Sequence, residues 1–158
     1  MVVSKRRQAR EMALQMLYQR ELGAASNDDV IRFFPPRRAQ GVDDEAPAPE
    51  SAGLRRHEAA FAYARTLFEG VIEHRDEIDH LIGQQAENWR LERMPAVDRN
   101  LLRLAVYEMV WQPDVPKLVV LDEAIELAKT FGSENSSRFV NGLLDGLLRT
   151  QAFPGSLT

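Results

Sequence analysis

The sequence contains no cysteine, no long apolar run and no glycine-rich phosphate loop. Without cysteine the chain can form neither a disulfide nor a thiol-based site, and this composition suits a reducing compartment. No stretch approaches the roughly twenty apolar residues that are needed to cross a bilayer, and the cationic start is not followed by the apolar run of a signal peptide. We therefore expect a soluble, cytoplasmic protein that does not enter a membrane.

Residue patterns typical of catalytic sites are also absent. The three histidines, His57, His74 and His80, have neither the i, i+3 or i, i+4 spacing nor the further ligands of a metal site. The stretch FGSENSS lacks the lysine and the preceding strand of a P-loop. We expect no enzymatic activity, no catalytic residue, no cofactor and no metal. A hydrolase that uses His74 or His80 is the alternative that the sequence favours least.

Apolar residues at helical spacing are abundant. The first segment carries one apolar stripe, which Gly23 ends: Ala9, Met12, Ala13, Met16 and Leu17. Helical spacing returns from residue 54 to about residue 86, with a kink near His74. We expect Pro95 to open the next helix and Asp114 to cap the one after it.

The C-terminal part of the chain continues this pattern. The stretch KLVVL could pass for a strand, but it runs without a break into helically spaced residues that end at Gly132, so we predict a helix. A last helix is expected from about Asn135 to Thr150. Six or seven helices without a convincing strand indicate an all-α fold.

With 158 residues the chain fits a single domain, 1–158, and 44% of its residues are hydrophobic, which is enough to fill a core. We expect two small packed helical bundles, an N-terminal one over 1–72 and a C-terminal one over 73–158. Residues 35–53 are rich in proline, alanine and acid, so we predict a mobile surface loop there.

Positive charge is concentrated at the start of an acidic chain. The first twenty residues sum to +4, whereas the whole chain is −4, so the remainder carries −8. Four cations crowd one helix end: Lys5, Arg6, Arg7 and Arg10. Leu14 and Tyr18 each lie within about 20° of Arg7 on a helix, so we expect guanidinium groups and an aromatic ring on an open face. Unpaired RNA would use both, although a merely solvated cationic helix start remains open.

The start of the last helix is a second candidate surface. Small hydroxyl and amide residues open it, and such a helix end can receive a phosphate. Arg138, Asn141 and Asp145 form its polar face. Phe139 lies at the edge of the apolar band, so the sequence leaves it open between the core and a surface ligand. Gly142 and Gly146, at i, i+4 spacing, are expected to let another helix approach closely.

Three stretches together resemble the NusB family of transcription antitermination factors. They are RRQAREMALQMLYQ, VDRNLLRLAVYEM and DVPKLVVLDEAIELAKTFGSENSSRFVNGLLDGL, and the last of these is the most specific. Residues 24–53 depart from the family pattern, which puts the family's second helix in doubt.

The resemblance implies a protein of two helical bundles that binds boxA of ribosomal RNA leader transcripts as single-stranded RNA. It implies ribosomal small-subunit protein NusE and the RNA polymerase antitermination complex as partners, and some relatives are homodimers. A helical scaffold or homodimer without sequence-specific RNA binding is the alternative.

The resemblance also assigns roles to individual residues. It places RNA at the arginine-rich start, where Arg6, Arg7 and Arg10 match, and at Phe139. We add their neighbours Lys5, Asn135 and Arg138 to the predicted RNA-binding residues. The resemblance places the protein partner at Tyr18 and Asp98. Asn135 stands where many relatives carry an acid, and an amide there removes repulsion against phosphate.

Overall fold

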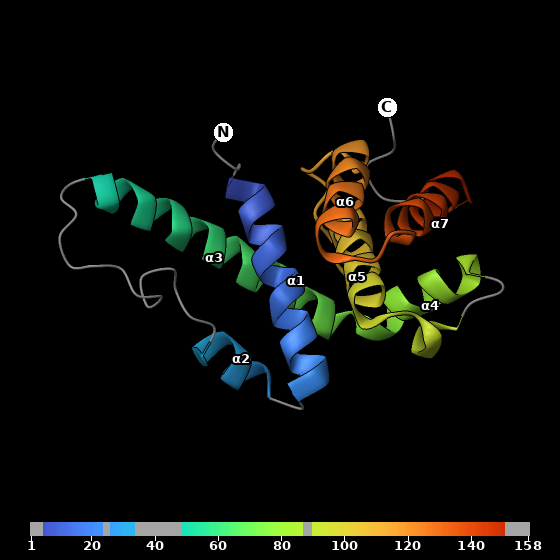
Figure 1. The fold of residues 1–158 in the computed structure, drawn as a ribbon, viewed down its shortest axis with the longest axis horizontal. Coiled ribbons are helices and arrows are strands. Elements are labelled where there is room, and N and C mark those ends of the chain that lie inside the picture. Colours follow the sequence, from blue (N-terminus) through green and yellow to red (C-terminus); the bar gives the residue numbers. More distant parts are fainter. Residues whose placement is uncertain (1–4, 24–25, 34–48, 87–89, 151–158) are drawn as a thin grey trace. The chain divides into compact units, whose positions relative to one another are not determined.

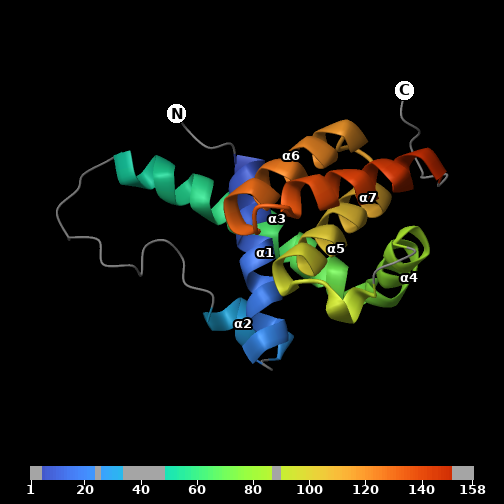
Figure 2. The same ribbon diagram turned by 45° about the vertical axis from the view of Figure 1, so that its right-hand side comes forward.

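A computed structural model describes residues 5–23, 26–33, 49–86 and 90–150 of the chain (Figures 1 and 2). Seven α-helices and one 3-10 turn occur in these ranges, and none of the described residues forms a strand, so the all-α prediction is confirmed. None of the described helices is both long and apolar enough to span a bilayer. The chain divides into two compact units, Met1–Glu69 and Gly70–Thr158.

Unit 1 contains α1 (Lys5–Gly23), α2 (Asn27–Phe33) and the first part of α3 (Pro49–Glu73). Each of these helices contributes buried apolar side chains: Ala9, Met12, Ala13, Leu14, Met16, Leu17, Val30, Ala60, Ala64, Leu67 and Phe68. The apolar stripe predicted for the first helix is therefore confirmed, as is its end at Gly23.

The short helix α2 corrects the doubt about a second helix between residues 24 and 53. The Ser26 hydroxyl accepts the backbone N–H of Asp29 at 3.1 Å, which caps the helix. Asp28 and Asp29 place negative charge in its first turn, where the helix dipole favours it. Arg20 of α1 donates to the side-chain oxygen of Asn27, so the two helices are also joined by a hydrogen bond.

The predicted loop 35–53 is partly wrong. Its last five residues belong to α3, which begins at Pro49, where a first-turn proline suits a helix because its missing N–H has no partner there anyway. The remainder of the predicted loop, 35–48, lies outside the described residues. α3 ends at Glu73, and His74 joins it to α4, which agrees with the kink predicted at that point.

Unit 2 contains the end of α3, α4 (Arg75–Gln85), the 3-10 turn η2 (Leu91–Arg93), α5 (Ala96–Trp111), α6 (Lys117–Phe131) and α7 (Ser136–Thr150). Figures 1 and 2 show α5 with α4, α6 and α7 beside it, and all three helices contact it. Ten consecutive residues of α5, 100–109, are buried. A helix that is buried on every face is the centre of its bundle.

Two helix starts in unit 2 differ from the sequence-based expectation. Pro95 is the residue that precedes α5, and its carbonyl accepts the N–H of Arg99 at 2.9 Å. Asp114 does not cap α6. Pro116 precedes that helix, and its carbonyl accepts N–H groups of Val119 and Val120. A proline fixes the backbone torsion just before the helix, and this constraint decides the start.

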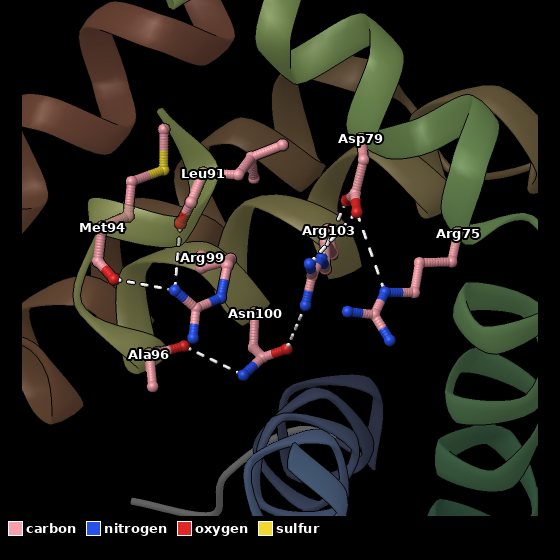
Figure 3. Close-up of polar contacts among 8 residues, drawn as sticks. All are labelled: Arg75, Asp79, Leu91, Met94, Ala96, Arg99, Asn100 and Arg103. Carbon is pink, nitrogen blue, oxygen red and sulfur yellow. Dashed lines mark hydrogen bonds and ion pairs between the residues drawn. The ribbon is translucent and has the colours of Figure 1, made fainter. Parts of the chain in front are cut away.

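Buried polar side chains join α4, η2 and α5 (Figure 3). Arg103 of α5 donates to both carboxylate oxygens of Asp79 of α4, at 2.8 and 3.1 Å, and also to Asn100 at 3.3 Å. Arg99 donates to the carbonyl oxygens of Leu91 and Met94 at 3.0 and 2.9 Å. Because buried charge is costly unless it is paired, these contacts fix how η2 and α4 pack on α5.

Two glycines of unit 2 show where a ring or a side chain comes close to the backbone. A Cβ on Gly70 would collide with the ring of Tyr107, and one on Gly146 would collide with the side-chain nitrogen of Gln85. The predicted close approach is therefore confirmed at Gly146, which faces α4. It is wrong at Gly142, which is exposed and has open space around it.

Candidate nucleic-acid interface

The cations at the start of α1 lie in different environments. Lys5 and Arg6 are exposed and Arg7 is half-buried, whereas Arg10 is only 4% exposed. Arg7 and Arg10 also have interaction partners within the protein. A phosphate in solution can reach Lys5 and Arg6 directly. Arg10 is a buried cation in the chain by itself, and its contact with RNA stays a prediction.

The aromatic ring next to these cations comes from α3. The guanidinium carbon of Arg6 lies 4.4 Å from the centre of the Tyr63 ring, which is a cation–π contact. Sequence analysis proposed Tyr18 as the aromatic on this surface, but eight residues of helix place Tyr18 about 12 Å beyond Arg10 along the axis. Tyr63 is 57 positions away from Arg6 in the sequence, so no local spacing could reveal this pair.

The predicted open face of α1 is interrupted at its centre. Leu14 lies between Arg7 and Tyr18 on that face, and it is 3% exposed. Further along the helix Tyr18 and Leu22 are 39% and 59% exposed. These two residues, at i, i+4 spacing, form an exposed apolar pair on one side of α1. The exposure of Leu22 was not predicted, although its position outside the apolar stripe indicates a residue that does not face the core.

The start of α7 presents polar groups to solvent. Asn135 and Arg138 are exposed, and Phe139 is half-buried with a contact inside the protein. The carbonyl of Asn135 accepts the N–H of Phe139 at 3.1 Å, so Asn135 is the residue that opens the helix. The partial burial of Phe139 agrees with its predicted place at the edge of the apolar band, and its contact with RNA stays a prediction.

Asp98, which is predicted to contact a protein partner, is buried in the structure. It is 4% exposed, and its carboxylate accepts the Ser136 hydroxyl at 2.6 Å. The same hydroxyl oxygen accepts the N–H of Ser133 at 2.9 Å. Asp98 therefore ties the first turn of α5 to the first residue of α7, and its contact with a protein partner stays a prediction.

Gly132 ends α6 immediately before this loop. A Cβ at position 132 would lie 2.5 Å from the Ser136 side chain and 2.7 Å from the Ala128 carbonyl. Only glycine permits the two helices to come so close at this turn. The predicted terminator is confirmed, and its role is to let α7 begin against α6.

His74 and His80 have contacts of their own within unit 2. The His74 ring stacks on Trp111 with ring centres 4.1 Å apart, while His80 is exposed beside an open hollow of about 430 Å³ lined by Asp76, Glu77, His80 and Leu81. Among the described residues no three potential metal ligands come together. The stack with Trp111 accounts for the position of the His74 ring.

Comparison with known proteins agrees with the fold and the motifs. The sequence profile of the NusB family matches residues 7–149. The transcription antitermination protein NusB of Myxococcus xanthus is 46% identical over 140 residues, which cover 89% of this chain and 91% of that protein. A solved structure of T. maritima NusB has 33% sequence identity and a TM-score of 0.73, and the match covers 96% of this chain and 95% of that one.

In a second solved structure, the matching protein is part of a complex. It contains antitermination factors NusB and NusE in complex with double-stranded RNA, and its matching chain has a TM-score of 0.73 and 24% identity, with 93% of this chain and 98% of that chain covered. At this identity the likeness supports the fold. Because the family profile spans nearly the whole sequence, and relatives match over most of their length, the chain belongs to the NusB family of transcription antitermination proteins.

Proposed function

We propose that this chain recognises boxA of ribosomal RNA leader transcripts as single-stranded RNA, together with ribosomal protein NusE, and so supports ribosomal RNA synthesis. The observation that carries the proposal is the exposed guanidinium of Arg6 held against the Tyr63 ring at a cationic helix end. The family is one of antitermination factors and not of enzymes. A similar protein assembles with NusE and RNA, which supports both partners.

RNA would meet two surfaces of the chain. The first is formed by Lys5, Arg6 and Arg7 on α1, and the second by Asn135, Arg138 and Phe139 at the start of α7. Arginine binds phosphate through paired N–H donors and stacks on bases, so a strand with accessible bases would use both of its properties.

A protein partner would dock on the exposed apolar pair of Tyr18 and Leu22. Exposed large apolar side chains are typical of the centre of an interface. The chain beyond residue 20 carries −8, so a basic ribosomal protein such as NusE would be attracted to it. We place this pair of proteins in the antitermination complex on RNA polymerase, in the cytoplasm.

Titration of labelled single-stranded RNA tests the proposal. Binding should be tighter to a boxA sequence than to a scrambled one and should tighten further with NusE. Arg6→Ala should lower the slope of log K against log salt by about 0.7. Arg149→Ala, which removes an equally charged and exposed side chain from the last turn of α7, is the matched control and should leave the slope unchanged.

The outcomes separate the alternatives. Equal binding of boxA and scrambled RNA, even with NusE, would indicate a helical scaffold that joins proteins only. Preference for a duplex over the single strand would replace the ligand by double-stranded RNA. Light scattering of the free chain would show whether it forms a homodimer, and the Leu22→Asp variant would show whether Tyr18 and Leu22 form that contact instead.

A further inference from the structure

Tyr63 occupies a rigid position beside the cationic end of α1. Its neighbours one turn away on α3, Ala60 and Leu67, are fully buried, as is the adjacent Ala64. Tyr63 itself is half-buried and has a further contact inside the protein. Packing on this side of α3 therefore fixes the ring, and a fixed ring can hold another side chain in place.

The contact leaves the donors of Arg6 available. The guanidinium carbon of Arg6 lies 4.4 Å from the centre of the Tyr63 ring. A guanidinium that stacks flat on a ring keeps its five N–H donors in its own plane, away from the ring. Within the described part of the chain, Arg6 has no ion pair with a carboxylate that would occupy them. The guanidinium is thus held beside the ring, and no carboxylate of the described residues occupies its donors.

We propose that Tyr63 is a positioning residue of the RNA interface, which holds the Arg6 guanidinium so that its N–H edge meets a phosphate of the bound strand. An exposed arginine loses rotamer freedom when it binds a ligand, and a side chain that is already ordered loses less. Tyr63 would thereby raise RNA affinity through Arg6. This inference rests on the proposed function, because it requires Arg6 to contact RNA.

A double-mutant cycle tests the inference with the full chain and single-stranded boxA RNA. Tyr63→Leu should weaken binding about two- to fivefold, the effect of losing an exposed cation–π contact. Tyr63→Phe keeps the ring and should bind as the unchanged protein does. In the Arg6→Ala background, Tyr63→Leu should have no further effect, because the residue that it positions is gone.

Arg6→Lys provides an independent variant that leaves α3 intact. Lysine keeps the positive charge but has no flat face to stack, so binding should weaken as in Tyr63→Leu while the salt slope stays unchanged. Melting temperatures and helical circular dichroism of all variants would establish that the folded protein is being compared.

Each contrary result has a distinct meaning. Equal losses from Tyr63→Leu with and without Arg6, or full affinity of Tyr63→Leu or Arg6→Lys, would overturn the positioning role. Tighter binding of Tyr63→Leu would overturn it as well, since the ring would then compete with RNA for Arg6. If Arg6→Ala itself binds RNA as well as the unchanged protein, the proposed RNA interface at α1 is wrong, and the role of Tyr63 is wrong with it.

Discussion

Arg6 of α1 and Arg103 of α5 are both arginines on helices, yet the two units use them in opposite ways. The Arg103 side chain is 7% exposed and is held by two hydrogen bonds to Asp79, so its donors serve the fold. Arg6 is exposed and lies over the Tyr63 ring, and no carboxylate of the described residues pairs with it, so its donors remain available to a ligand. The partner and the burial of an arginine therefore decide its role, and its presence in a helix does not.

The largest expected effect on stability comes from removing Arg103, the buried arginine of the two. Arg103→Ala should lower the free energy of unfolding by about 3 kcal/mol, the lower end of the range for a broken buried pair, because Asp79 is a quarter exposed and can be rehydrated. Urea unfolding measures this loss. Arg149→Ala, whose side chain is 78% exposed, is the control and should change stability by less than about 0.5 kcal/mol. A loss below about 1 kcal/mol at Arg103 would contradict the assigned role.

Asp98 is another buried charged residue with a partner inside the fold, although the family resemblance predicts a contact with a protein partner. Asp98→Ala should cost about 1–3 kcal/mol of stability, because the Ser136 hydroxyl loses its buried acceptor. Asp98→Asn retains an oxygen acceptor and should cost less. Asp114→Ala, at an exposed position, is the control. An Asp98→Ala protein with unchanged unfolding but weakened NusE binding would support the partner assignment.

The exposed Asn135 tests the proposed RNA surface at the start of α7. Asn135→Asp should weaken RNA binding about fivefold, since one added negative charge near a phosphate costs about 1 kcal/mol in water. Stability should not change, because aspartate and asparagine cap helices equally well. Asn141→Asp adds the same charge at another exposed position on α7 and should affect binding less. Equal weakening by the two substitutions would indicate a general charge effect without a contact at Asn135.

The smallest expected effect is the difference in stability between alanine substitutions at the open Gly142 and at the packed Gly146. Gly142→Ala should raise the free energy of unfolding by about 0.5–1 kcal/mol, because the site is open and alanine favours a helix. Gly146→Ala should raise it less or lower it, since its new Cβ displaces the Gln85 side chain, which accepts a hydrogen bond from Thr150 at 3.2 Å. Thermal unfolding of both variants checks the difference, and equal gains would show that Gly146 is not packed against α4.

Much of the fold followed from local sequence patterns. The apolar stripe of α1, its end at Gly23 and the end of α6 at Gly132 were predicted correctly, because helix periodicity and glycine act within a few residues. The starts of α2 and α6 were missed. A serine cap before a very short helix gives a weak signal, and Asp114 was an acceptable cap two residues ahead of the proline that the helix uses.

The candidate site was predicted by type of residue but not by arrangement. Its cations were found from their crowding at one helix end, and the family from three sequence stretches. Arg10 was placed at the surface although it is buried, and Asp98 was placed at an interface although it bonds Ser136. Side chains at neighbouring helical angles differ in exposure according to the helix that covers them, and this cover is not visible from one helix alone.

The sequence by itself determined that the chain is helical, where most helices end, and that positive charge gathers at its start, because these properties depend on neighbouring residues. Only the tertiary structure decided which arginines are available to a ligand. Tyr63 meets Arg6 across 57 positions, and Asp79 meets Arg103 across 24, so both contacts exist only after helices pack. Packing sets the burial and the partner of each charge, and these two quantities determine whether it stabilises the fold or is available to a ligand.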